Sequence, residues 1–312
     1  MKIARRVPTQ WQLRTQSLEL GRRTIVMGVV NITADSFSDG GRFLAPERAV
    51  EQALRLLRHG AQIIDLGAES TRPGSRAGEP LQAAVSAQQE QDRLLPVLEM
   101  LLRHRPATLI SIDTYKAATA RVALAAGAEI INDVSGFAWD AAMSQVCAEA
   151  RCGVVLMHTR GRPDEWLRQP SLDSDQIFPL VREGLSASLR NALNVGISPS
   201  AIVLDPGYGF GKRMSENFIL LRHQAELLAL GHPLLVGLSR KSFLRHALAS
   251  RLGREVRSVS SMENAGVSAM TAAILAGASI VRVHSARAAT EAAAIADALL
   301  EQPDSSTSGN ED

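Results

Sequence analysis

The sequence is short of cysteine and of net charge, and each shortage narrows what the protein can be. Its 312 residues include two cysteines, Cys147 and Cys152. Two thiols exclude a disulfide-rich scaffold and are too few to make a four-ligand zinc site on their own. We expect both to be small buried side chains. The formal net charge is +2, from 34 basic and 32 acidic residues, so nucleic acid is not the expected partner.

Long apolar runs are also missing. No stretch approaches the roughly 20 residues that span a bilayer, so we expect no membrane contact. The N-terminal segment MKIARRVPTQWQLRT is basic but lacks the apolar core of a signal peptide. We therefore expect a cytoplasmic protein.

Lysine is rare among the basic residues. It occurs at four positions, Lys2, Lys116, Lys212 and Lys241, out of 34 basic residues. A need for a compact point charge would explain lysine at a given position, and a plain compositional bias would explain the rarity equally well.

What the sequence does contain is a repeated pattern. Short β-branched runs alternate with longer amphipathic stretches rich in Ala and Leu. Strands are predicted over 25–31, 63–66, 109–113, 130–133, 154–157, 202–205, 234–237 and 280–283. Helices are predicted over 46–59, 81–103, 117–126, 141–150, 175–194, 215–230, 263–276 and 286–300.

This alternation indicates an α/β fold. Near-continuous apolar strands separated by helices are typical of a parallel sheet covered by helices. Eight such units in about 250 residues match a closed (β/α)8 TIM barrel. A doubly wound open sheet is the alternative, because periodicity does not show whether a sheet closes.

Three segments are expected along the chain. Residues 1–23 form an extension, in which the alternation in WQLRTQSLELGRRT predicts a β-hairpin that would plug the N-terminal end of the barrel. Residues 24–300 form the barrel as a single domain. Residues 301–312, EQPDSSTSGNED, are acidic, small and polar, which predicts a disordered tail.

Polar side chains gather where the predicted strands end. In a parallel barrel these C-terminal ends form the rim that carries the active site. The set consists of Asn31, the segment DLGAESTRPGS at 65–75, Asp113, Asn132, Asp133, His158, Asp205, Lys241, Arg282 and His284. Turn formation explains any one of them. It does not explain an amide, carboxylates, a lysine, an arginine and a histidine converging on one rim, so we predict the active site there.

Seven stretches of the sequence, in order, resemble those of the dihydropteroate synthase family. They are MGVVNITADSFSDGG, AESTRPGS, SIDT, INDVSG, LDPGYGFGK, GLSRKSF and RVH. The resemblance runs from the first predicted strand to the last. It implies a (β/α)8 barrel that joins 6-hydroxymethyl-7,8-dihydropterin diphosphate to 4-aminobenzoate and releases pyrophosphate with the help of Mg²⁺. It also implies a homodimer formed through barrel helices.

The resemblance implies a pterin subsite made of Asp113, Asn132, Met157, Asp205 and Lys241. A buried carboxylate such as Asp205 can accept two N–H groups from the guanidine-like edge of a pterin. An amide both donates and accepts, and a lysine donates to ring acceptors. As alternatives, Asp113 could be a helix N-cap, Met157 could simply fill the barrel, and Lys241 could be a Schiff-base lysine as in barrel aldolases.

The resemblance places the diphosphate near Asn31, Thr71, Arg72, Arg282 and His284, with Asn31 as the one protein ligand of Mg²⁺. Mg²⁺ usually takes one or two protein oxygens and keeps waters and phosphate oxygens for the rest. Arginine and histidine offer charge-assisted hydrogen bonds to phosphate. A salt bridge on the barrel rim is the alternative for Arg282.

The implied 4-aminobenzoate subsite consists of Phe37, Arg72, Pro73, Gly209, Phe210 and Ser242. Ser242 lies at the start of a further helix expected after the strand at 234–237, and the first N–H groups of a helix favour a carboxylate. The glycines and small polar residues of 32–41 and 70–75 predict two lids that keep water from a reactive intermediate.

Our mechanistic hypothesis is dissociative: pyrophosphate leaves the pterin methylene before the amine of 4-aminobenzoate attacks, with Lys241, Arg72 and Asp113 as the catalytic residues. The sequence offers no activated nucleophile, so positioning and electrostatics must carry the rate. Two alternatives remain open. One is a methyltetrahydrofolate-type pterin methyltransferase, which needs no diphosphate site, and the other is a non-catalytic pterin-binding paralogue.

Overall fold

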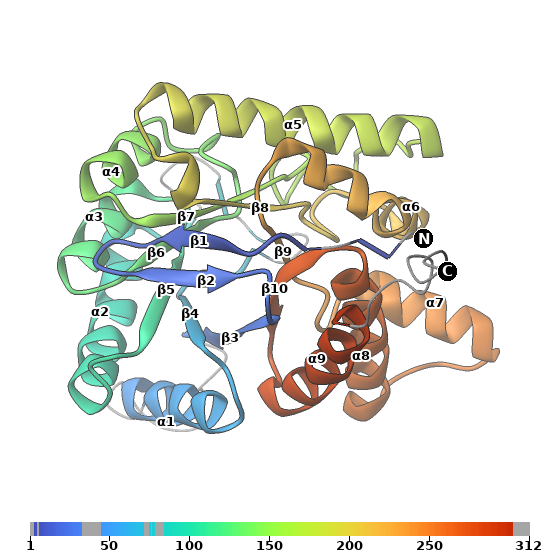
Figure 1. The fold of residues 1–312 in the computed structure, drawn as a ribbon, viewed down its shortest axis with the longest axis horizontal. Coiled ribbons are helices and arrows are strands. Elements are labelled where there is room, and N and C mark those ends of the chain that lie inside the picture. Colours follow the sequence, from blue (N-terminus) through green and yellow to red (C-terminus); the bar gives the residue numbers. More distant parts are fainter. Residues whose placement is uncertain are drawn as a thin grey trace, which may run out of the picture.

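Eight parallel strands close into a barrel, with helices packed around its outside (Figure 1). The computed structural model describes residues 3–4, 6–32, 45–71, 75, 77–78 and 84–301. The strands neighbour one another in the order β10-β3-β4-β5-β6-β7-β8-β9. Closure rules out the open doubly wound sheet. The expected disordered tail, apart from Glu301, and the expected lids, apart from Ile32, Ser70, Thr71 and Ser75, lie outside the described residues.

All eight predicted barrel strands are confirmed, and their ends differ from prediction by at most two residues. They are β3 (Ile25–Asn31), β4 (Ile63–Gly67), β5 (Leu109–Asp113), β6 (Ile130–Asp133), β7 (Gly153–Met157), β8 (Ile202–Asp205), β9 (Leu234–Val236) and β10 (Ala278–Val283). The α-helices are α1 (Ala45–Arg58), α2 (Ala87–His104), α3 (Ala117–Ala125), α4 (Met143–Ala150), α5 (Ser174–Asn194), α6 (Met214–His223), α7 (Ser242–Leu252), α8 (Val259–Leu275) and α9 (Ala286–Leu300).

Three helix boundaries were predicted wrongly, each for a local reason. Helix α2 begins at Ala87 rather than 81, because Ser86 and Gln89 form a capping box that fixes the start. Helix α8 begins at Val259 rather than 263, with Ser258 as its N-cap. The predicted helix 215–230 changes at Gln224 into a 3₁₀ helix, η3 (Gln224–Leu230).

The predicted N-terminal hairpin is confirmed as β1 (Thr9–Gln12) paired antiparallel with β2 (Ser17–Leu20). It lies across one end of the barrel (Figure 1). Its side chains pack on the inward-facing residues of all eight strands in one buried cluster: Trp11, Leu13, Leu20, Ile25, Met27, Ile63, Leu109, Ile130, Val155, Val203, Leu235 and Ile280. The Trp11 indole also donates to the Ala201 carbonyl at 2.8 Å. The hairpin therefore plugs the N-terminal end as predicted.

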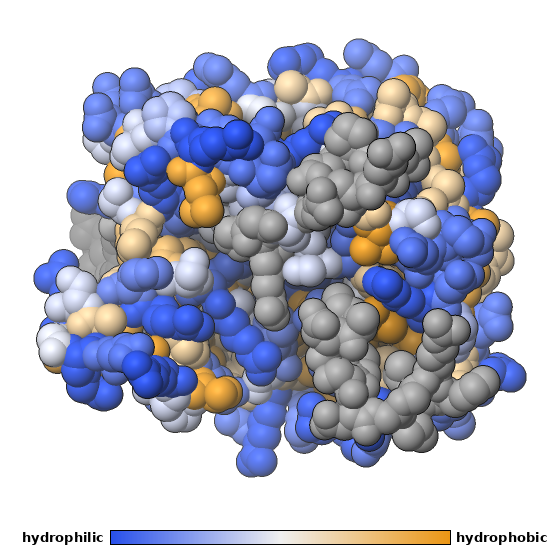
Figure 2. Space-filling view, turned by 180° about the vertical axis from the view of Figure 1, so that it is seen from behind, coloured by the Kyte–Doolittle hydropathy of each residue, from blue (hydrophilic) through white to orange (hydrophobic). Residues whose placement is uncertain are grey.

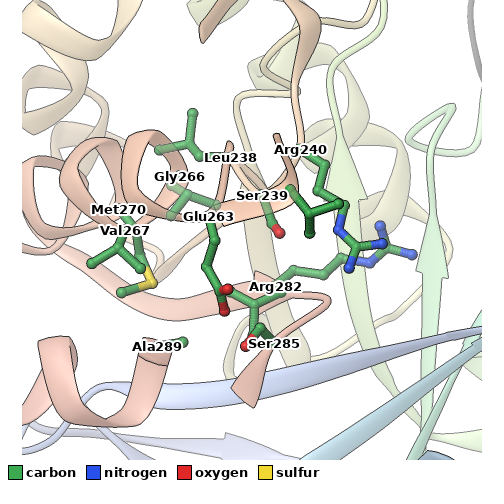
Figure 3. A pocket seen from close by; sticks show the side chains of 13 residues that line it. Leu238, Ser239, Arg240, Glu263, Gly266, Val267, Met270, Arg282, Ser285 and Ala289 are labelled. Atoms are coloured by element: carbon green, nitrogen blue, oxygen red, sulfur yellow. The ribbon is translucent and has the colours of Figure 1, made fainter. Parts of the chain in front are cut away.

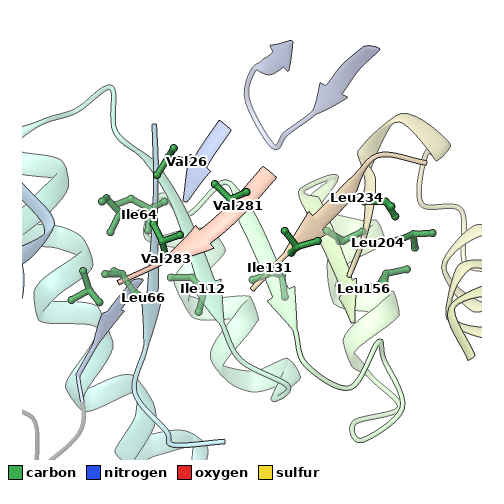
Figure 4. Packing of buried hydrophobic residues seen from close by; sticks show 14 of the residues in the cluster. Val26, Ile64, Leu66, Ile112, Ile131, Leu156, Leu204, Leu234, Val281 and Val283 are labelled. Atoms are coloured by element: carbon green, nitrogen blue, oxygen red, sulfur yellow. The ribbon is translucent and has the colours of Figure 1, made fainter. Parts of the chain in front are cut away.

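The alternate strand residues face outward into the helices. Val26, Ile64, Leu66, Ile112, Ile131, Leu156, Leu204, Leu234, Val281 and Val283 belong to this outer core (Figure 4). Cys147 and Cys152 are buried free thiols within it, as predicted. Burial of both strand faces explains why the strands read as continuous apolar runs.

The molecular surface opposite the hairpin is mainly hydrophilic, with apolar residues in small separate groups (Figure 2). Among the described residues, no helix combines the length and the apolar character needed to cross a membrane.

Candidate functional site

A polar layer lies directly above the apolar floor of the barrel. Side chains two residues apart in a strand point the same way. Asp65 therefore points into the barrel, because it lies two residues after the inward-facing Ile63. Asn132, Asp205 and Arg282 point inward for the same reason, since each lies two residues after an inward-facing apolar residue. Asp205 is the last residue of its strand, Asn132 and Arg282 are the next-to-last of theirs, and Asp65 lies two residues before the end. Strand alternation and closure together bring these four side chains toward one mouth.

Arg282 lies at the centre of a charged network. Its Nε donates to Asp65 Oδ2 at 2.6 Å, and its Nη2 donates to Asp113 Oδ2 at 2.5 Å. The Asn132 amide nitrogen donates to the same Asp65 oxygen at 3.2 Å. Four strands, β4, β5, β6 and β10, are thus joined by side chains. The salt-bridge alternative for Arg282 is correct, and its contact with a diphosphate stays a prediction.

Asp113 is held by this network rather than used as a helix cap. The N-cap of α3 is Lys116, and the first helical amide, that of Ala117, is bound by Asp140 Oδ2 at 2.8 Å. Burial raises the pKa of Asp113 to about 7, against the lowering effect of Arg282 and with a further rise from Asp65. A carboxyl group with this pKa exchanges a proton near physiological pH.

Asp205, the last residue of β8, and Lys241, the N-cap of α7, form a second charged group. Asp205 is buried, and its Oδ1 accepts from the Gly207 amide at 2.7 Å. The ammonium of Lys241 lies 3.9 Å from the centre of the Phe210 ring. Burial raises the pKa of Asp205 to about 6 and lowers that of Lys241 to about 7, while each charge opposes the shift of the other. A carboxylate, an ammonium and an aromatic face therefore share this side of the mouth.

The remaining predicted residues lie around the same end of the barrel. Asn31 ends β3 and is half-buried beside Gly67 of β4. Met157 is buried at the end of β7, next to Asp205. The His284 ring nitrogen Nδ1 lies 3.1 Å from Ser239 Oγ.

Gly209 and Ser242 occupy the predicted 4-aminobenzoate side. A Cβ on Gly209 would lie 3.2 Å from Lys241 Cδ, so the glycine packs closely on that side chain. Ser242 is exposed at the first position of α7. Thr71 is described and half-buried, whereas Phe37, Arg72 and Pro73 lie outside the described residues, so their roles stay predictions.

A small crevice adjoins this site between α8 and the ends of β9 and β10 (Figure 3). Its lining includes Ser239, Arg240, Glu263, Arg282 and Ser285. Its volume is about 30 Å³, which suits a water molecule and is far too small for a bicyclic ring. The crevice is therefore not the substrate site.

The described residues contain no group of three or more His, Cys, Asp or Glu side chains arranged to hold a metal ion. The predicted Mg²⁺ ligand is instead the amide of Asn31, a hard oxygen donor at a strand end. Because Mg²⁺ commonly binds through one protein oxygen together with waters and substrate phosphates, this donor fits the ion.

Sequence reasoning assigned no role to three residues at this end of the barrel, Asp65, Ser239 and Lys212, although each lies in a stretch that it singled out. Asp65 carried a usable signal, since it has the same parity as Ile63 in a strand that was predicted correctly. Lys212 ends the stretch LDPGYGFGK and stood out otherwise through the rarity of lysine. Ser239 carried none, because its contact with His284 joins two strand ends that are distant in the chain.

The comparisons with known proteins agree on one family. A model of the family described as "Pterin binding enzyme" matches residues 27–284. A dihydropteroate synthase from Synechocystis sp. is 40% identical over 279 residues, which cover 89% of this chain and 91% of that protein.

Solved structures from Xanthomonas albilineans agree as well. Its dihydropteroate synthase with 4-aminobenzoic acid is 35% identical with a TM-score of 0.81, covering 95% of this chain and 100% of that one. The same enzyme with 7,8-dihydropteroate is 33% identical with a TM-score of 0.78, covering 94% and 100%.

Proposed function

The chain belongs to the dihydropteroate synthases of the pterin-binding enzyme family, and from this premise we propose how its side chains divide the substrates among them. It condenses 6-hydroxymethyl-7,8-dihydropterin diphosphate with 4-aminobenzoate to give 7,8-dihydropteroate and pyrophosphate. The observation that carries the assignment of residues is the polar layer of Asp65, Asn132, Asp205 and Arg282 directly above the apolar barrel floor.

The pterin is recognised by Asp205, Asn132, Asp113 and Lys241. The Asp205 carboxylate accepts from the two donors of the guanidine-like edge. The hydrogen bond to Asp65 fixes the orientation of the Asn132 amide and leaves its oxygen and one N–H for the ring. Asp113 accepts a ring N–H, and Lys241 donates to ring acceptors. Met157, buried beside Asp205, packs on the ring face.

Departure of the diphosphate is assisted by cationic side chains. The bond between the pterin methylene carbon and the diphosphate oxygen breaks, and its electron pair leaves with pyrophosphate. Arg282, His284, Arg72 and the Thr71 hydroxyl offer donors for the developing charge. Asn31 would hold Mg²⁺ through its amide oxygen, and the ion when bound supplies further neutralisation of the leaving group.

The amine of 4-aminobenzoate then forms the new carbon–nitrogen bond, and the proton that it loses passes to the solvent. Phe210 and Gly209 border its ring, together with Phe37 and Pro73, while Ser242 at the start of α7 and Arg72 receive its carboxylate. A Schiff-base role for Lys241 is unnecessary, because the electrophile is a methylene carbon and not a carbonyl. Positioning and charge therefore carry the reaction.

Two further properties belong to the same proposal. We propose a homodimer through the helices that carry exposed apolar side chains, including Phe218 of α6, Leu252 of α7 and Val259 of α8. Light scattering should give twice the mass of one chain, and a monomer at micromolar concentration would contradict it. We also propose the cytoplasm as the compartment, consistent with two unpaired cysteines, which cell fractionation would check.

The pterin affinity is expected to depend on pH as a bell. Below pH 6 the affinity falls because Asp205, whose pKa is raised to about 6, takes up a proton. Above pH 7 it falls because Lys241, whose pKa is lowered to about 7, loses one. Titration calorimetry with the dihydropterin diphosphate from pH 5 to 8.5 should show a maximum between these values. Constant affinity over the range would contradict the two assignments.

The experiment that tests the activity is a pyrophosphate-release assay with Mg²⁺ and the dihydropterin diphosphate. Release is expected to depend on added 4-aminobenzoate and to match the 7,8-dihydropteroate formed. Binding of the dihydropterin without such release would instead identify a non-catalytic paralogue.

A further inference from the structure

The loop after β8 is wound around one buried lysine. Lys212 is buried, and its ammonium donates to three main-chain carbonyls. The distances are 3.1 Å to the oxygen of His158, 2.7 Å to that of Gly207 and 3.2 Å to that of Phe210. An ammonium group has three hydrogens, so all of them are used. Lys212 thereby ties the end of β7 to the loop that leaves β8.

The loop cannot relax away from this lysine. Gly207, Gly209 and Gly211 have φ values of +67°, +80° and +70°. A Cβ on Gly207 would lie 2.0 Å from the His158 carbonyl oxygen. The Asn217 side chain of α6 accepts from the Gly209 amide at 2.6 Å and donates to the Lys212 carbonyl at 3.1 Å. The conformation is therefore fixed from both sides.

Two residues connect Lys212 directly to Asp205. The Gly207 amide donates to the Asp205 carboxylate at 2.7 Å, while the Gly207 carbonyl accepts from Lys212. The His158 amide donates to the Asp205 carbonyl at 2.9 Å, while the His158 carbonyl accepts from Lys212. Through Gly207 the buried ammonium is linked to the Asp205 carboxylate, and through His158 it is linked to the Asp205 main chain.

Other titratable side chains surround the pair formed by Lys212 and Asp205. Asp205 is influenced by Lys241, Lys212 and Arg282, all of which favour its ionised form, and it influences in turn the buried Tyr208. Burial lowers the pKa of Lys212 to about 7, so it is an ammonium at pH 6; Asp205 and Glu216 oppose this fall, and Lys241 and Arg160 add to it. Lys212 in turn disfavours a charge on His158. Lys241 packs on Phe210 and is the proposed pterin donor, whereas the Lys212 hydrogens are all taken by the main chain.

We propose that Lys212 is a positioning residue for pterin binding. It shapes the 207–210 turn beside Asp205 and supplies a buried positive charge that keeps this carboxylate ionised. This role presupposes Asp205 as the pterin's carboxylate partner. Burial of an acid disfavours its charged form, and an adjacent cation offsets that cost. The three carbonyl contacts place the cation without exposing it to the substrate.

Lys212→Met and Lys212→Gln test the charge. Calorimetry with 6-hydroxymethyl-7,8-dihydropterin diphosphate from pH 5 to 8 should show the acidic midpoint of binding moved upward by about one to three pH units. Affinity at pH 6 should fall about tenfold or more, and the loss should shrink as pH rises. Gln keeps N–H donors for two carbonyls without the charge, so its shift should equal that of Met. An equal loss of affinity at every pH, with an unmoved midpoint, would overturn the proposal.

Lys116→Met is the matched control. Lys116 is also mostly buried, but its partners are Glu69 and Glu90 rather than Asp205. The acidic midpoint of pterin binding in Lys116→Met should equal that of the unchanged protein. A shift as large as that of the Lys212 variants would show that the effect does not come from the charge of Lys212. If the Lys212 variants do not fold, ¹⁵N-lysine NMR of the unchanged protein decides: at pH 6 Lys212 should be a slowly exchanging ammonium, and a neutral amine would overturn the proposal.

A further variant distinguishes the role of Lys212 from the assignment on which it rests, that of Asp205 to the pterin. Asp205→Asn with unchanged affinity would remove Asp205 from the pterin site. Weakened binding in Asp205→Asn together with an unmoved midpoint in the Lys212 variants would reject only the role of Lys212.

Discussion

Asp205→Asn is expected to weaken binding of the dihydropterin by roughly a hundredfold, because charged hydrogen bonds contribute about 1.5–3 kcal/mol each and one acceptor oxygen becomes a donor. That new N–H₂ group would face the donors of the pterin edge. The amide of Gly207 can still donate to the remaining side-chain oxygen, so the turn should persist. Titration calorimetry at pH 6.5, with circular dichroism to verify folding, measures the effect.

Asp133→Asn is the matched control for Asp205. Asp133 is also buried at a strand end, but it has the opposite parity to Asn132 and accepts from the Ser135 amide at 2.7 Å and the Phe137 amide at 3.0 Å. The Asp133→Asn variant should be less stable than the unchanged protein but should keep its pterin affinity within about twofold, because the Asp133 carboxylate supports a turn. Equal loss of affinity in both variants would show that buried charge in general, rather than contact with the pterin, is responsible.

Arg282→Met is expected to lower the free energy of unfolding by about 3–5 kcal/mol at pH 7.5, the cost of leaving buried carboxylates without their partner. Asp65 is fully buried, and Asp113 is confined beside it. Urea unfolding followed by fluorescence measures the change. Pyrophosphate release should also be lost, since the variant lacks a donor for the leaving group.

The pH dependence of this variant identifies the cause. The pKa of Asp113 in the folded protein is already raised to about 7, above its ordinary value, and loss of Arg282 raises it further. A group with a raised folded-state pKa binds its proton more tightly in the folded state, so the penalty should shrink as pH falls from 7.5 to 5.5. Asp65→Asn combined with Arg282→Met should be less destabilised than Arg282→Met alone. Strictly additive effects of the two changes would contradict the network.

The strands and their order could be predicted from local pattern, but their lateral contacts could not. Apolar runs bounded by polar residues located every strand of the barrel to within two residues. The contact between Arg282 and Asp65 joins residues 217 apart in the chain, and it exists only because the barrel closes between β10 and β3. Periodicity carries no information on closure, so the network was out of reach even though the rim was predicted.

Helix ends were harder because they depend on side chains outside the apolar pattern. The run at 81–86 looked helical, yet the Ser86 and Gln89 capping box placed the start later. The residues of the site also differ in how far local pattern could identify them. Strand parity would have found Asp65, whereas the role of Lys212 depends on three carbonyls from two separate segments.

A crystal structure with bound 6-hydroxymethyl-7,8-dihydropterin diphosphate tests most directly whether the polar layer above the barrel floor holds the pterin. The ring is expected within hydrogen-bonding distance of Asp205, Asn132 and Lys241, with the diphosphate directed toward Asn31 and His284. A ring bound in another part of the molecule, with Asp205 and Lys241 untouched, would contradict the account.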